Sequence, residues 1–189
     1  MEKKKSKLKS LLSVQEFGIF IIFLVLCIVI GCISPKFFKL ANLINILRQI
    51  SNVGIMAVGE AMVIIIAGID LSISAILSLS ACTAAVLAQY MNPWIAVLIA
   101  LLVGGGVGML NGLLSVKIGI APFIATLGTQ MMAKGVAFMI TKGIPVKFQN
   151  SASILGGGRI ALGNGIQIPV PIIFLIIIYT IGIVVMTQT

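Results

Sequence analysis

Two carboxylates lie in otherwise apolar sequence, and they are the residues best able to do chemistry here. Glu60 lies in NVGIMAVGEAMVIIIAG, and Asp70 follows in the segment 68–74, GIDLSIS. A lone carboxyl group in lipid is costly, so it faces a cavity or another helix. Glu60 is either a hydrogen-bonded packing residue or a group that carries a proton or contacts a substrate. Asp70 is either the N-cap of the next helix, accepting from the N–H groups of residues 72 and 73, or part of a gate; the two roles are compatible.

A polar ridge is the second feature whose residues could take part in chemistry. Pro122 suits the first turn of a helix, and Thr126, Gln130 and Lys134 follow it at intervals of four residues. Lys134 can extend its amine toward the membrane surface. Because lipid would reject Gln130, the ridge as a whole indicates a water-accessible interior.

The composition shows what kind of protein must position these residues. The chain has 189 residues, of which 60% are hydrophobic and only 9% charged, and its mean hydropathy is +1.24. A soluble fold would lack the polar residues to cover its surface, so this is a multi-pass membrane protein. There is no His and no GxxxxGK[ST] motif. We therefore expect no catalytic site, no metal site, no cofactor and no nucleic-acid partner.

About 20 apolar residues are needed to cross a bilayer, and this length predicts an all-α architecture with six spans. The spans are expected at residues 14–33, 51–68, 72–90, 93–116, 122–141 and 169–187. Residues 51–90 are long enough for two crossings with nothing left for a loop, so the break at 68–74 lies at the membrane boundary or within it. Residues 34–50 predict a short amphipathic helix at the interface, and residues 142–168 predict a Gly-rich loop.

Small residues recur at every fourth position of the fourth predicted span, and they predict a helix-packing face. They are Ala96, Ala100, Gly104, Gly108 and Gly112.

The N-terminal tail sets the expected orientation. Five of the first ten residues are Lys, and a basic run before a first span keeps that end cytoplasmic. We expect residues 1–13 to be a cytoplasmic tail and residues 14–189 to form a single membrane domain.

Three segments together resemble the membrane permease subunits of bacterial ABC importers for ribose and related simple sugars. They are SPKFFKLANLINILRQ, NVGIMAVGEAMVIIIAGIDLSIS and APFIATLGTQMMAKGVAFMITKGIPV, in the order and spacing of that family. The resemblance covers about residues 15–189. It implies that Lys134 lies where the family has a basic residue, and that two short signatures are present. The residues that match them are Gly68, Asp70, Leu71 and Ser72 in the first, and Pro122, Phe123, Thr126, Leu127 and Gly128 in the second. Ser74 departs from the family's usual Gly.

The resemblance also implies partners: a cytoplasmic ATP-binding subunit, an extracytoplasmic sugar-binding protein and a second permease copy, in the bacterial inner membrane. From their polarity within the spans and from the two signatures, we expect the residues of the transport pathway or gate to be Glu60, Gly68, Asp70, Ser72, Thr126, Gln130 and Lys134. Permeases of this family are much longer, so we expect an N-terminal fragment that lacks the loop that docks on the ATPase. The alternative is a self-contained small channel or a proton-coupled carrier that uses Glu60.

Overall fold

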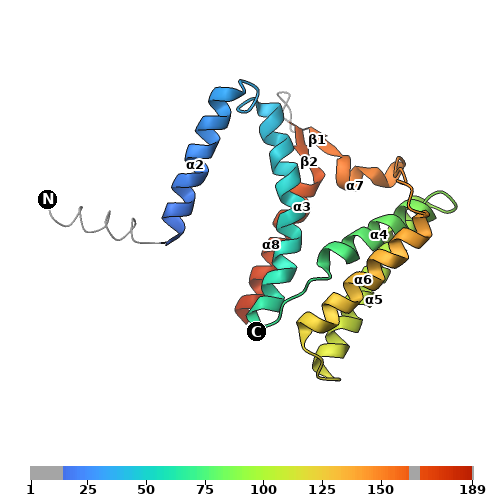
Figure 1. Ribbon diagram of the computed structural model, residues 1–189. Helices are drawn as coiled ribbons and strands as arrows, with labels where there is room; N and C mark the ends of the chain where they lie inside the picture. Colours follow the sequence, from blue (N-terminus) through green and yellow to red (C-terminus); the bar gives the residue numbers. More distant parts are fainter. Residues whose placement is uncertain (1–14, 162–166, 189) are drawn as a thin grey trace. The chain divides into compact units, whose positions relative to one another are not determined.

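The computed structural model describes residues 15–161 and 167–188 (Figure 1). The predicted basic tail 1–13 and residues 162–166 of the predicted Gly-rich loop lie outside the described residues. The elements in chain order are α2 (Gln15–Ile33), α3 (Leu40–Ile65), α4 (Ile73–Leu87), α5 (Pro93–Val116), α6 (Pro122–Thr141), the 3₁₀ helix η1 (Ser151–Ser153), α7 (Ile154–Gly157), β1 (Arg159–Ala161), β2 (Gln167–Pro169) and α8 (Val170–Gln188). The all-α membrane class is confirmed, and the described strands form one short hairpin. The chain divides into two compact units, one up to Leu47 and one from Arg48.

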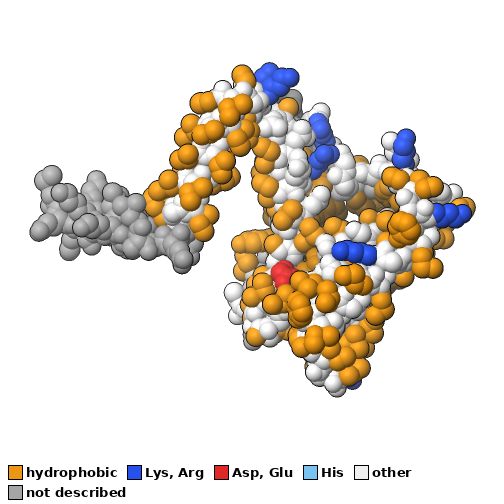
Figure 2. Space-filling model, viewed as in Figure 1, with side chains coloured by type: hydrophobic (Ala, Val, Ile, Leu, Met, Phe, Trp, Pro, Cys, Tyr) orange, Lys and Arg blue, Asp and Glu red, His pale blue; other side chains and the backbone are white. Residues whose placement is uncertain are grey.

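The first unit consists of α2, a turn and the beginning of α3. Figure 2 shows hydrophobic side chains over most of the visible face of α2, as expected for a helix that faces lipid. In the turn at residues 34–39, the ring of Phe38 lies where a Cβ on Gly31 would be. The side-chain amide of Asn42 donates to the carbonyl of Phe37 at 2.8 Å. These contacts fix the reversal of direction after α2.

Helix α3 corrects the prediction of a separate interfacial helix at residues 34–50. Residues 34–39 form turns, and the amphipathic residues that follow are the first half of one 26-residue helix that also contains most of the predicted second span. The physical reason is that no Pro or Gly occurs between Leu40 and Val53. Amphipathic periodicity shows which face of a helix is polar, and it does not by itself show where the helix ends.

Helices α4, α5 and α6 form the packed part of the second unit, with α4 against both of the others (Figure 1). Their core consists of Ala75 and Leu79 from α4 and Ala133 and Ala137 from α6, with Val103 of α5 packed against them. Most of these side chains are small, so the helix backbones can approach closely.

The predicted small-residue face of α5 is used over part of its length. Ala96 and Ala100 are buried. A Cβ built on Gly104 would lie 2.7 Å from Oγ of Ser80 in α4, so this glycine permits the close approach of the two helices. Gly108 and Gly112 are exposed and have open space beside them.

Helix α4, which follows the break, is too short to cross a bilayer by itself. Three of the described helices, α5, α6 and α8, are long and apolar enough to cross a bilayer, whereas α4 has 15 residues. At 1.5 Å per residue α4 spans about 22 Å, which is less than the hydrocarbon core of about 30 Å. Tyr90 and Trp94, in and after the exposed turn that follows α4, are residue types that lie at membrane interfaces. If these two residues mark one interface, the start of α4 lies short of the opposite interface.

The segment between α6 and α8, residues 142–169, contains η1, α7 and the strands β1 and β2. Helix α6 ends at Thr141, and the next two residues, Lys142 and Gly143, both have positive φ. The strands β1 and β2 then pair antiparallel, with Arg159 opposite Pro169, and α8 begins directly after β2.

Substituting single glycines of α5 tests this packing. Gly104→Ala should lower the free energy of unfolding by about 1–3 kcal/mol, because Ser80 or the helix backbone must shift. Gly108→Ala, the matched control in open space, should leave the stability unchanged or raise it by up to about 1 kcal/mol. The measurement is unfolding of the purified protein by SDS in mixed micelles. Equal effects of the two substitutions would contradict the described contact between α4 and α5.

Candidate functional site

The site is built around the non-helical residues between α3 and α4. Ala67 takes a left-handed conformation with φ of 56°, which costs a residue with a side chain about 1–2 kcal/mol. The N–H of Gly68 donates to the carbonyl of Val63 at 2.9 Å and closes the end of α3. Gly68 is buried, and a Cβ there would lie 3.0 Å from Val63 and 3.6 Å from Pro122 at the start of α6. The segment that follows α3 therefore packs closely against the start of α6 at Gly68.

Asp70 organises the next residues through its side chain. Its Oδ1 accepts from the backbone N–H of Ser72 at 2.7 Å and from the Ser72 hydroxyl at 2.6 Å. The N-cap of α4 is Ser72, so the N-cap role considered for Asp70 is wrong, whereas its expected acceptance from the N–H of residue 72 is confirmed. Asp70 lies two residues too early for that position and forms a local turn with Ser72 instead.

Asn111 of α5 completes this part of the site. Its Nδ2 donates to the Ser72 hydroxyl oxygen at 2.8 Å, and both side chains are buried. Ser72 has one hydroxyl proton, and Asp70 accepts it, so the amide nitrogen must be the atom that faces Ser72. The Asn111 Oδ1 then points away and has no hydrogen-bond partner in the part of the chain that the structure describes.

Thr126 of α6 holds the break from the other side. Its Oγ1 accepts from the N–H of Leu71 at 3.2 Å, and it lies 2.8 Å from the carbonyl of Pro122, one turn earlier in α6. The same oxygen lies 3.3 Å from the carbonyl of Ile69. Because the hydroxyl has a single proton, the shorter contact to Pro122 is the better candidate for its donated bond. Thr126 is 3% exposed, so these contacts lie in the interior.

Glu60 of α3 supplies the third acceptor. Its Oε1 accepts from the N–H of Asp70 at 3.4 Å, and the side chain is half-buried. The successive N–H groups of residues 70, 71 and 72 therefore each have a side-chain acceptor: Glu60, Thr126 and Asp70 respectively. An N–H group without a partner in hydrocarbon would cost several kcal/mol, so this arrangement makes a non-helical segment possible at this depth.

The other residues of the predicted ridge lie outside the network. Gln130 is half-buried and Lys134 is exposed. The reason is geometric: the buried face of α6 includes Thr129 and Ala133. Gln130 and Lys134 each come one residue after a member of that face, and successive residues of a helix are about 100° apart. The structure thus brings Glu60, Gly68, Asp70, Ser72 and Thr126 together, while Gln130 and Lys134 take no described part.

Asn111 was missed by the sequence reasoning, although a signal was present. It is the one amide side chain in the 24 residues of α5, and a polar residue within a span is expected to have a partner. The neighbouring glycines drew the interpretation toward packing alone.

The chemistry of the cluster is hydrogen bonding between hydroxyl, amide and carboxyl groups. Among the described residues, neither Glu60 nor Asp70 forms an ion pair, and no group of three His, Cys, Asp or Glu side chains is placed to hold a metal ion. The arrangement can stabilise a helix break and contact polar solutes.

A family model described as "Branched-chain amino acid transport system / permease component" matches residues 42–189. The ribose import permease protein RbsC of Escherichia coli (strain K12) is 37% identical over 152 residues, covering 79% of this chain and 47% of the relative. RbsC of Bacillus subtilis (strain 168) is 34% identical over 168 residues, covering 88% and 52%. The D-allose transport system permease protein AlsC of Escherichia coli (strain K12) is 36% identical over 174 residues, covering 87% and 50%.

The chain spans about half the length of the curated relatives that it matches. No solved structure matches it.

Two substitutions test the pair of hydrogen bonds that links Asn111 to Ser72 and Ser72 to Asp70. Ser72→Ala should lower the free energy of unfolding by about 1–3 kcal/mol, because it leaves the buried amide of Asn111 without its partner. Asn111→Leu should cost less, since it removes the unpartnered Oδ1 together with the donor and keeps the bond from Ser72 to Asp70. The measurement is SDS-induced unfolding in mixed micelles. A larger loss for Asn111→Leu than for Ser72→Ala would contradict the described order of donors and acceptors.

Proposed function

The chain belongs to the family described as the permease component of branched-chain amino acid transport systems, and on that premise we propose that it is a membrane-spanning subunit of an ATP-driven importer for a monosaccharide such as ribose. The names of the relatives support the substrate class, because they are permeases for ribose, allose and galactose. The observation that carries the proposal is the polar helix break within apolar helices, in which three successive N–H groups have side-chain acceptors. Transporters use such breaks, because non-helical backbone at membrane depth occurs where it lines a cavity or is buried in protein.

The proposed assembly follows from this role. A separate cytoplasmic subunit binds and hydrolyses ATP, an extracytoplasmic protein delivers the sugar, and a second permease copy forms the other side of the pathway. Residues 14–189 act as one membrane domain in the bacterial inner membrane. The lysines before α2 support a cytoplasmic N-terminus.

In this proposal the residues of the break have distinct roles. Gly68, Asp70 and Ser72 form the break, and Glu60 and Thr126 hold it through its backbone N–H groups. Gln130 and Lys134, which continue along α6, contribute polar groups to the pathway. The contact from Asp70 to Glu60 supports a positioning role for this carboxylate, and it favours the permease over a proton-coupled carrier that uses Glu60.

A sugar-uptake assay tests the proposal. Residues 1–189 replace the matched half of the Bacillus subtilis ribose permease, and uptake of labelled ribose, allose and galactose is measured in cells that lack that permease. We expect uptake of at least one of these sugars, dependent on the ATP-binding subunit. A chimera that reaches the membrane in normal amounts and transports none of the three would contradict the proposal.

Glu60 variants in the same assay separate the two mechanisms. Glu60→Gln should keep most of the uptake, because the amide oxygen can still accept from Asp70, whereas Glu60→Leu should lose most of it. A proton-coupled carrier predicts loss with Glu60→Gln as well, and uptake by the chain alone in proteoliposomes driven by a pH gradient.

A further inference from the structure

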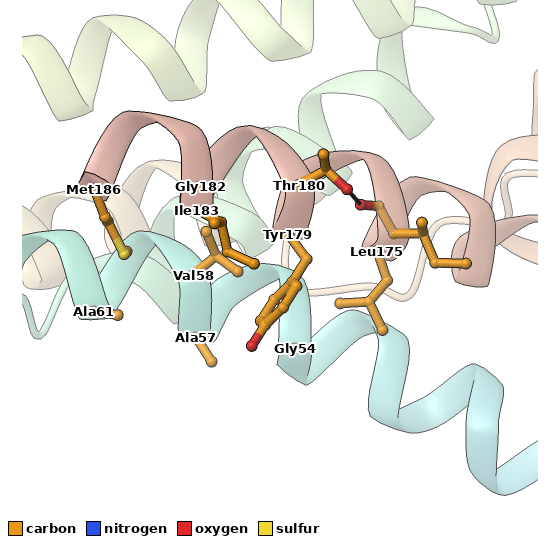
Figure 3. Close-up of a pocket in the computed structure, with 11 residues that line it drawn as sticks. Gly54, Ala57, Val58, Ala61, Leu175, Tyr179, Thr180, Gly182, Ile183 and Met186 are labelled. Atoms are coloured by element: carbon orange, nitrogen blue, oxygen red, sulfur yellow. Dashed lines mark hydrogen bonds between the residues drawn. The ribbon is translucent and has the colours of Figure 1, made fainter. Parts of the chain in front are cut away.

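An apolar groove of about 630 Å³ lies between α3 and α8 (Figure 3). Its lining residues are Gly54, Ala57, Val58, Ala61, Leu175, Ile176, Tyr179, Thr180, Gly182, Ile183 and Met186. All of them belong to the unit that begins at Arg48. The groove is separate from the polar cluster at the helix break, so the proposed role of that cluster does not account for it.

Small residues shape the groove. A Cβ on Gly182 would lie 2.6 Å from Cγ1 of Val58, and a Cβ on Gly54 would lie 2.7 Å from Cδ1 of Leu175, so both glycines allow α3 and α8 to approach. Ala57 and Ala61 of α3 also line the groove, and their small side chains leave space beside this contact. Small side chains in membrane helices are typical of surfaces that receive another helix.

Tyr179 supplies a second, independent observation. In Figure 3 it extends from α8 toward α3 on the side of Gly54. It lies nine residues after Val170, the first residue of α8. At 1.5 Å per residue, this is about 14 Å along the helix from its start, which is about half the thickness of the hydrocarbon core. Tyrosine usually lies at the membrane interfaces, where its hydroxyl meets water.

The Tyr179 hydroxyl lacks a partner within the described residues. The side chain is 58% exposed and makes no hydrogen bond there. The other hydroxyl of the lining, that of Thr180, donates to the carbonyl of Ile176 at 2.7 Å. A lipid acyl chain would fill the groove but would leave the tyrosine hydroxyl unpaired at membrane depth. A helix with a polar side chain or an accessible carbonyl would satisfy it.

We propose that the groove receives a transmembrane helix from the other half of the permease sequence, with a hydrogen-bonding group opposite Tyr179. This inference rests on the proposed function. The length of the relatives supports this occupant, because their sequences contain about as many residues again as the half that matches this chain. Any polypeptide that supplies that half can carry the occupant.

Photo-crosslinking in the chimera described above tests the occupant. The photoreactive residue p-benzoylphenylalanine replaces Tyr179 in one variant. In the matched control it replaces Ile177, which is exposed but faces away from the groove. After irradiation in lipid nanodiscs, mass spectrometry identifies the adducts. We expect position 179 to react with a helix of the ribose permease half and position 177 to react mainly with lipid.

Each other result overturns the proposal. Adducts of position 179 with lipid alone would show a lipid-filled groove, and adducts with a second copy of this chain would show a homodimer contact. If neither the ribose nor the allose permease half yields a monodisperse chimera, the groove does not accept such a helix. The readout requires no transport, so an inactive chimera with the expected adduct would count against the proposed function and not against the groove.

A conservative variant gives a measurement that does not depend on the photoreactive residue. Tyr179→Phe removes only the hydroxyl, so it should lower the Tm of the chimera by about 2–4 °C and leave the Tm of the chain alone unchanged. An equal Tm for the chimera with Tyr and with Phe would overturn the hydrogen bond. An equal loss in the chimera and in the chain alone would place the partner of Tyr179 within this chain.

Discussion

The structure depends on one constraint: a backbone N–H group within a membrane must find an acceptor in the protein. The break between α3 and α4 exposes three successive N–H groups, those of residues 70, 71 and 72. Glu60, Thr126 and Asp70 accept from them. The acceptors come from α3, from α6 and from the break itself, so the conformation of the break depends on how two helices are packed around it.

The packing of α4, α5 and α6 places these polar groups. Small core residues such as Ala75 and Ala133 bring the three backbones together, and the close approach at Gly104 holds α5 against α4. This approach carries Asn111 to the Ser72 hydroxyl, which in turn donates to Asp70. The hydrogen bonds are therefore a consequence of apolar packing, and the break in turn determines where α4 begins.

The sequence predicted much of this site because polar residues are expensive in lipid. Glu60, Asp70, Ser72 and Thr126 stood out from apolar surroundings, and the length of residues 51–90 required a break. Other features depend on packing that periodicity does not encode. The register of α6 decides that Thr126 faces inward while Gln130 and Lys134 turn away. The amphipathic residues continue into the rest of α3 because no Gly or Pro interrupts the helix between Leu40 and Val53. The role of Asn111 follows from its distance to Ser72, which only the fold provides.

Amide hydrogen exchange at Leu71 tests the central claim most directly. The wild type and Thr126→Val, which has nearly the same shape, are compared in nanodiscs with residue-level fragmentation. The account predicts that exchange at Leu71 becomes about fivefold to tenfold faster in Thr126→Val, as expected for the loss of one hydrogen bond. Exchange in the loop at residues 146–149 should stay the same. An unchanged rate at Leu71 would show that Thr126 does not hold the break.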